Sequence, residues 1–228
     1  MNNLGKKVVP YVVISAMIVL LAAPTWAASK SGDEQTLRNA ATVLQAMLDS
    51  KDIPGSVVSK ADCIIVLPSV KKFAVGIGGT GGRGPMSCRE GKDFRGKWSA
   101  PAMYSIGGAS AGVQLGGTAT DYVLLIMAPS AAEKVMNGKV KVGSDATAAA
   151  GPGASTSTSG GADILTYSRT KGLFAGVSLN GASLDIDQDA NARLYGSGVT
   201  AQQILTGGNV KETPGGKALV SLLDSHIH

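Results

Sequence analysis

The stretch KWSAPAMYSIGGASAGVQLGGTATDYVLLIM, residues Lys97 to Met127, has the composition that decides the fold. Small residues alternate with larger ones through its centre, and the stretch ends in an apolar run, Val123 to Met127. Successive side chains of a β-strand point to opposite faces of the sheet. The alternation therefore predicts a strand with one nearly bare face, which another backbone or a flat ligand can approach closely, at Gly112, Gln114 and Gly116.

The same pattern occurs at two other places in the chain. Residues Ala111–Gly117 read AGVQLGG, Ala175–Gly181 read AGVSLNG, and a weaker copy, AVGIGG, lies at Ala74–Gly79. Such repetition predicts related strand–turn–strand units rather than strands that alternate with helices. We expect a single α+β domain: a strongly curved, mainly antiparallel β-sheet or barrel-like sheet with an N-terminal helix and a few short helices.

The N-terminal helix is predicted at Asp33–Ser50, where apolar residues recur at steps of three and four. It either docks on the sheet or lies on a membrane surface, although a membrane-surface helix usually has more cations on its polar face. Shorter helices are predicted at Pro129–Met136 with Ser130 as N-cap, at Thr200–Leu205 and at Pro214–Leu223.

Residues 1–27 are predicted to be a signal peptide, with residues 28–228 forming the domain. Lys6 and Lys7 precede an apolar region, Tyr11–Ala23, and small residues follow it. The apolar run is short for a transmembrane helix, which needs about 20 residues, and an uncleaved anchor is the alternative. We expect an exported protein, periplasmic or envelope-associated in a Gram-negative bacterium.

The chain has two cysteines, Cys63 and Cys88. An even pair in an exported chain predicts a disulfide. Each cysteine lies in a predicted strand, 62–67 or 85–89, with a Gly-rich hairpin between them. The cross-link would close a loop of about 25 residues and stabilise the fold by roughly 3 kcal/mol through chain entropy.

The sequence contains no convincing catalytic or cofactor motif. Gly76-x-Gly78-x-x-Gly81 matches the dinucleotide fingerprint by letter, but no helical pattern follows it. The aspartates of Ser183–Asp189 resemble the start of a calcium loop that lacks its Gly and Glu, and a strand with Asp185 and Asp187 facing water is predicted instead. Both histidines lie at the C-terminal end. We expect a non-enzymatic protein without cofactor or metal.

Several motifs, in this order and spacing, resemble the SYLF domain, a lipid-binding family that is described as an actin-binding domain in its fungal members. The motifs are Lys97-Trp98-Ser99-Ala100-Pro101, Gly112-x-Gln114-x-Gly116-Gly117, Thr120-Asp121-x-Val123-Leu124, Ala150-Gly151-Pro152-Gly153, Tyr167-Ser168-x-x-Lys171-Gly172-Leu173-Phe174-Ala175-Gly176-Val177-Ser178-Leu179-x-Gly181 and Asp189-x-Asn191-x-x-Leu194-Tyr195-Gly196. The resemblance implies a non-enzymatic phospholipid-binding domain. For an exported chain it implies association with anionic lipid or the envelope, and actin is not expected as a partner.

Positive charge is concentrated between Lys60 and Ala100, which contain eight positive and three negative residues. Each Lys or Arg near an anionic membrane contributes about 1 kcal/mol, so we predict binding of an anionic phospholipid or membrane surface there. The predicted lipid-binding residues are Lys71, Lys72, Arg83, Arg89, Lys92, Arg95, Lys97 and Trp98. The alternatives are a solvated basic rim and a Trp98 that packs in the core rather than at a membrane interface.

A second hypothesis is a structural or protein-interaction module of the envelope. Its bare Gly faces and sheet edges would pair with a partner or with a second copy, which makes a homo-oligomer an option. No nucleic-acid partner is expected.

Overall fold

The computed structural model describes residues 28–75, 77–111, 116–138, 140–142, 147–149, 163–170, 173–174, 179, 182–207 and 210–225. The predicted signal peptide lies outside these residues, as does all of the repeat at Ala175–Gly181 except Leu179.

The described helices and strands follow one another along the chain as a first helical pair, two long hairpins and a mixed C-terminal part. They are α1 (Lys30–Asp49), α2 (Gly55–Val58), β1 (Cys63–Val75), β2 (Ile77–Cys88), β3 (Ala102–Ala111), β4 (Gly116–Ile126), α3 (Pro129–Met136), β5 (Val140–Val142), β6 (Thr147–Ala149), β7 (Ile164–Thr170), β8 (Leu173–Phe174), β9 (Ala182–Ile186), α4 (Gln188–Tyr195), α5 (Ala201–Leu205) and α6 (Pro214–Asp224).

All nine strands belong to one sheet in the order β5-β9-β3-β2-β1-β4-β7-β6, with β8 paired to β7. Neighbours are antiparallel except β6 and β7, which are parallel. Val140 of β5 and Ile164 of β7 lie near opposite ends of this order, yet both belong to the same buried cluster. The sheet therefore curls around a shared core, which confirms the predicted α+β fold with a strongly curved, mainly antiparallel sheet.

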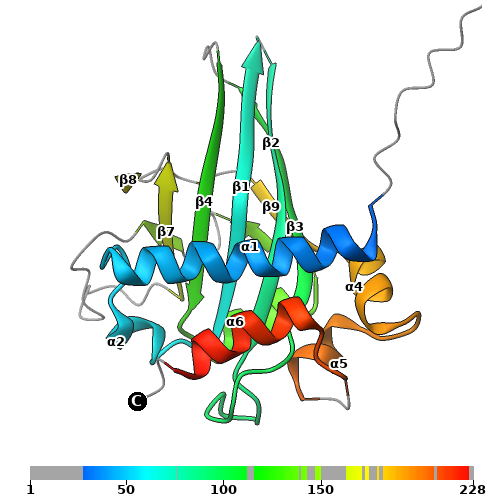
Figure 1. The fold of residues 1–228 in the computed structure, drawn as a ribbon. Helices are drawn as coiled ribbons and strands as arrows, with labels where there is room; N and C mark the ends of the chain where they lie inside the picture. Colours follow the sequence, from blue (N-terminus) through cyan, green and yellow to red (C-terminus); the bar gives the residue numbers. More distant parts are fainter. Residues whose placement is uncertain are drawn as a thin grey trace, which may run out of the picture.

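The sheet separates two cores. Cys63, Ile65 and Leu67 of β1 point into an inner core with α3 and α5, whereas Ile64 and Val66 point into an outer core with α1, α2 and α6. Figure 1 shows α1 and α6 side by side across the outer face of the sheet. Because both faces of β1 are buried here, its sequence is a continuous apolar run rather than an alternating one.

Beyond the layer covered by α1, strands β1 to β4 continue as a projecting part of the sheet (Figure 1). A bulge marks the start of this part: Pro68 and Ser69 of β1 lie opposite one residue of β4, Asp121. Ser69 adopts a positive φ of 51°, and its N–H donates to the Asp121 carboxylate at 2.8 Å. A Cβ at Gly84 of β2 would lie 1.9 Å from the Val66 carbonyl oxygen, so glycine is required where β2 passes the bulged strand.

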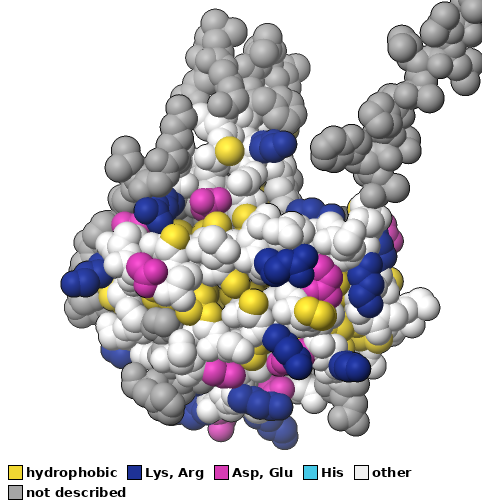
Figure 2. All heavy atoms as spheres, in the orientation of Figure 1, with side chains coloured by type: hydrophobic (Ala, Val, Ile, Leu, Met, Phe, Trp, Pro, Cys, Tyr) yellow, Lys and Arg dark blue, Asp and Glu magenta, His cyan; other side chains and the backbone are white. Residues whose placement is uncertain are grey.

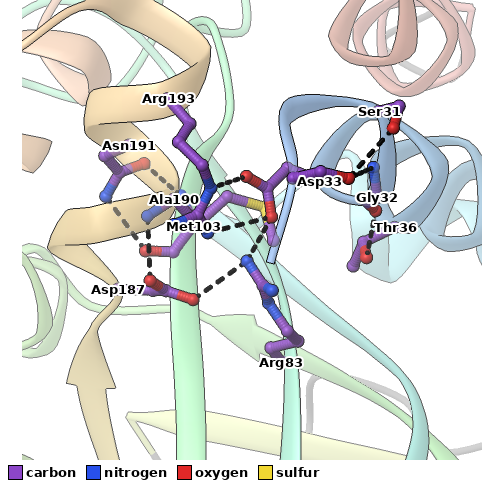
Figure 3. A network of polar contacts seen from close by, with 11 residues as sticks. Ser31, Gly32, Asp33, Thr36, Arg83, Met103, Asp187, Ala190, Asn191 and Arg193 are labelled. Atoms are coloured by element: carbon purple, nitrogen blue, oxygen red, sulfur yellow. Dashed lines mark hydrogen bonds and ion pairs between the residues drawn. The ribbon is translucent and has the colours of Figure 1, made fainter. Parts of the chain in front are cut away.

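Two neighbouring acids near the start of α1 fix this helix to the rest of the fold, and Figure 3 shows the contacts of the first, Asp33. Asp33 is fully buried and forms ion pairs with Arg83 of β2 and Arg193 of α4, with Arg193 Nε 2.6 Å from Asp33 Oδ2. Arg83 also lies 3.1 Å from Asp187. The neighbouring Glu34 accepts a hydrogen bond of 2.6 Å from the Gly215 N–H at the start of α6. The helix is thus docked on the sheet, as one of the two interpretations of its sequence predicted.

The predicted helices all form, but two details of the sequence prediction are wrong. Ala128, not Ser130, is the N-cap of α3, because Pro129 takes the first helical position, where its missing N–H is not needed. Asp187 does not extend a strand: it caps α4, accepting a hydrogen bond from the Ala190 N–H, so β9 ends at Ile186. Among the helices of the described residues, none is both long and apolar enough to cross a membrane.

Candidate functional site

The candidate site is built around the β2–β3 connection, residues 89–101. Its two ends are joined by a bridge between Arg89 and Trp98. The Glu90 N–H donates to the Lys97 carbonyl and the Gly96 N–H to the Glu90 carbonyl, both at 2.8 Å. A Cβ at Gly96 would lie 2.6 Å from the Glu90 carbonyl oxygen. Backbone contacts therefore hold this connection as a compact loop at the end of the sheet opposite the projecting part.

Phe94 anchors the tip of this connection. It adopts a positive φ of 50° and is buried in the inner core, while Lys92, Arg95 and Lys97 on either side of it are exposed. A positive φ is uncommon for a bulky residue, and burial of the phenyl ring offsets its cost. Lys97 Nζ lies 3.8 Å from the Glu90 carboxylate. Along the lower edge of the face in Figure 2, Lys and Arg side chains lie among Asp and Glu side chains.

Arg89 and Trp98 form the base of the site. The Arg89 guanidinium lies 5.1 Å from the centre of the Trp98 ring, a cation–π arrangement. Its Nη2 donates to the Ser59 carbonyl at 2.9 Å, which ties the connection to the end of α2. Trp98 is 2% exposed and packs in the outer core. Trp98 thus packs in the core rather than at a membrane interface, which was one of the two alternatives for this residue. It contacts the site through Arg89.

A pocket of about 410 Å³ opens between the β2–β3 connection and the segment that joins α2 to β1. It is lined by Ser59, Lys60, Ala61, Asp62, Arg89, Asp93, Phe94 and Arg95, and we call it the Asp62 pocket. Burial raises the pKa of the Asp62 carboxyl, and the positive charges of Arg89 and Arg95 offset part of that rise. A second pocket, of about 380 Å³, lies on the other side of Arg89 and Phe94, against α3 and α5.

The structure brings together five of the eight residues predicted to bind lipid: Arg89, Lys92, Arg95, Lys97 and Trp98. The other three lie elsewhere. Lys71 and Lys72 are on the projecting part of β1, eight and nine residues from Cys63 and hence about 25 to 30 Å away along the strand. Lys72 points toward the Tyr122 ring, 5.9 Å away, and burial lowers the pKa of its ammonium group.

Arg83, the third, belongs to the network that docks α1 (Figure 3). Its guanidinium pairs with both Asp33 and Asp187. Asp33 has no solvent exposure, so Arg83 compensates a buried charge. This places Arg83 in the scaffold of the fold rather than in the candidate site.

The disulfide predicted between Cys63 and Cys88 is present, and both residues are fully buried. The two cysteines lie directly opposite each other in the ladder of β1 and β2. The next pair outward is Asp62 and Arg89, and the Arg89 N–H donates to the Asp62 carbonyl at 2.9 Å. The predicted cysteine pairing thus also implied that Asp62 lies beside Arg89. The sequence prediction selected cations and Trp98, and it missed Lys60, Asp62 and Asp93 in the same pocket.

A Gly-x-Ser-x-Gly pattern occurs at residues 108–112, around Ser110. As a nucleophile motif it requires a sharp turn from a strand into a helix. Ser110 instead lies inside β3, where it pairs with Gly78 of β2 in an antiparallel ladder. At Ser110 the backbone is extended and paired, without the sharp turn that the motif requires at the nucleophile.

Comparison with known proteins identifies the family. Residues 107–226 match the family described as "Ysc84: Las17-binding protein actin regulator". Protein YSC84 of Saccharomyces cerevisiae is 34% identical over 76% of this chain. LAS seventeen-binding protein 3 of the same yeast is 33% identical over 76%. The bovine SH3 domain-containing YSC84-like protein 1 is 32% identical over 77%.

The matches cover 38% of each of these two yeast proteins and 52% of the bovine one, so the chain spans about half of their length or less. One of these relatives is named as a binding protein, and the family description, which names an actin regulator, gives no support to the expectation that actin is excluded as a partner. The sequence identity, the matched residues and the SYLF motifs agree, and the chain belongs to the Ysc84 (SYLF) family.

Proposed function

We propose that this protein is a non-enzymatic phospholipid-binding protein of the cell envelope and that its β2–β3 connection faces the membrane. The observation that carries the proposal is the exposure of Lys92, Arg95 and Lys97 on one short connection that Phe94 and Arg89 hold in place. Three such cations at an anionic surface contribute about 1 kcal/mol each. The signal-like residues 1–27 favour export and an encounter with the envelope, in the periplasm of a Gram-negative bacterium.

The docking of α1 favours the β2–β3 connection over this helix as the membrane-facing element. The apolar side of α1 is already buried in the outer core, at Leu44 and Met47 for example. Its sequence contains two cations, Lys30 and Arg38, and Arg38 lies 3.9 Å from Glu34. A docked helix with so few cations has little to offer an anionic surface.

Reversal of the three exposed charges tests the proposal. The variant Lys92→Glu/Arg95→Glu/Lys97→Glu is expected to bind vesicles of phosphatidylglycerol and phosphatidylcholine about a hundredfold more weakly than the wild type. The control, Lys51→Glu/Lys71→Glu/Lys217→Glu, changes the net charge equally at exposed sites elsewhere and should lose far less affinity. Co-sedimentation over a range of lipid concentrations measures both. Equal losses would show that the β2–β3 connection has no special role, and a wild type that binds no vesicles would refute the proposal.

A protein-interaction module is the second candidate, favoured by the names of the relatives and by one feature of the projecting part of the sheet. Gly81 of β2 lies opposite Gly107 of β3, and a Cβ added to either would have no atom within 4 Å. Among the described residues this makes a bare patch of backbone that a partner can approach. Failure of vesicle binding in the experiment above would leave this candidate as the better account.

A further inference from the structure

We infer that the Asp62 pocket binds a phosphoethanolamine group, which carries a phosphate and a primary ammonium on one short chain. The inference rests on the proposed function and deepens it, because it names the class of phospholipid: an aminophospholipid such as phosphatidylethanolamine, rather than a purely anionic lipid.

The pocket contains charges of both signs from two segments. Lys60 and Asp62 come from the segment between α2 and β1, whereas Arg89, Asp93 and Arg95 come from the β2–β3 connection. Over the part of the chain that the structure describes, neither carboxylate forms an ion pair within 4.0 Å, and neither guanidinium does. Carboxylates and guanidinium groups that share a pocket without forming ion pairs with one another leave room for a ligand that brings one charge of each sign.

Asp62 is the strongest indication of the ammonium end. Its Oδ2 atom is buried and has no hydrogen-bond partner among the described residues. Its backbone is held on both sides, because its N–H donates to the Ile126 carbonyl at 2.8 Å and its carbonyl accepts from the Arg89 N–H. The backbone position of Asp62 is therefore fixed by the sheet. A buried acceptor without a partner is costly, and a ligand ammonium would supply the missing donors.

Arg95 is suited to the phosphate end. Arg95 is exposed on the β2–β3 connection, and a guanidinium can donate two parallel hydrogen bonds to a phosphate. Arg89 adds a fixed positive charge, since its position is set by the Trp98 ring and the Ser59 carbonyl. The two ends of the ligand would thus meet opposite charges within one pocket of about 410 Å³, a volume typical of small-molecule sites.

The lining distinguishes this headgroup from two others. A choline group has no N–H to donate and is recognised by aromatic cages, whereas the aromatic residue among the described lining residues is Phe94, beside two carboxylates. A headgroup with additional phosphates would be repelled by Asp62 and Asp93. A primary ammonium with a single phosphodiester satisfies both carboxylates and cations.

The variant Asp62→Asn tests the inference in the full chain as its host processes it. The wild type should bind vesicles of phosphatidylethanolamine and phosphatidylglycerol about tenfold more tightly than vesicles in which phosphatidylcholine replaces phosphatidylethanolamine. Asp62→Asn should lose this preference, keep its binding to phosphatidylglycerol, and melt at a temperature no lower than that of the wild type, because a charge that burial disfavours is removed. The control Asp49→Asn, an exposed carboxylate on α1, should keep the preference.

The outcomes separate this inference from the proposed function. Wild-type binding to phosphatidylglycerol without any preference for phosphatidylethanolamine overturns the inference and leaves the proposed function standing. A preference that survives in Asp62→Asn also overturns it. Soluble glycerophosphoethanolamine, titrated by calorimetry, is the second arm. If it binds the wild type but not Asp62→Asn, while no vesicle is bound, the pocket chemistry is supported with a soluble ligand and the membrane function is refuted.

Discussion

Replacement of Asp33 with Asn is expected to lower the free energy of unfolding by about 3 kcal/mol. The Asp33 carboxylate is fully buried between Arg83 and Arg193, and its loss leaves two guanidinium groups facing each other across a neutral amide. We expect the low end of the cost of breaking a buried pair, because the Arg83 and Arg193 side chains are 32% and 26% exposed and water can solvate them in part. Urea unfolding monitored by circular dichroism measures the loss.

The same substitution should also loosen α1, since Asp33 joins this helix to β2 and α4 (Figure 3). Amide hydrogen exchange should therefore become faster in the first turns of α1 than in β1. Asp49→Asn, at the other end of α1, is the matched control, because its carboxylate is exposed and accepts a hydrogen bond from Gln45. An Asp33→Asn protein as stable as this control would contradict the docking role of the network.

Removal of the disulfide by Cys63→Ala/Cys88→Ala should cost roughly 3 kcal/mol through the greater entropy of the unfolded chain. The two residues are 25 apart in sequence. The cost should be somewhat larger than this, because both sulfur atoms lie in the inner core and their removal leaves a cavity. Thermal unfolding of the variant and of the oxidised wild type gives the difference. Identical melting temperatures would show that the cross-link does not constrain the unfolded chain.

Local patterns in the sequence predicted much of the fold. The apolar spacing of α1, the capping residue of α5 and the proline that opens α6 are each encoded within a few residues, and all three helices form there. Helix α4 was missed because its eight residues include few apolar ones and its N-cap, Asp187, also fits the end of a strand. The strands β1 and β2 are longer than predicted, because their projecting parts consist of small residues and lysines rather than apolar runs.

The candidate site was predictable only in part, since it depends on contacts between distant segments. The cations of the β2–β3 connection are adjacent in sequence and were identified together. Arg83 lies near them in sequence, but its partner Asp33 is 50 residues away, so its structural role could not be read from its neighbours. Asp62 became part of the site through the register of β1 and β2, which the cysteine pair fixes. The distribution of charged residues along the sequence did not reveal that Asp62 belongs to the site.

The most direct test of the membrane-facing β2–β3 connection is hydrogen–deuterium exchange of the protein with and without vesicles of phosphatidylethanolamine and phosphatidylglycerol. If this connection faces the membrane, slower exchange with vesicles should be concentrated at residues 89–98 and at residues 59–62 of the Asp62 pocket. Unchanged exchange in both segments, with slower exchange confined to α1 or to the projecting part of the sheet, would contradict the account.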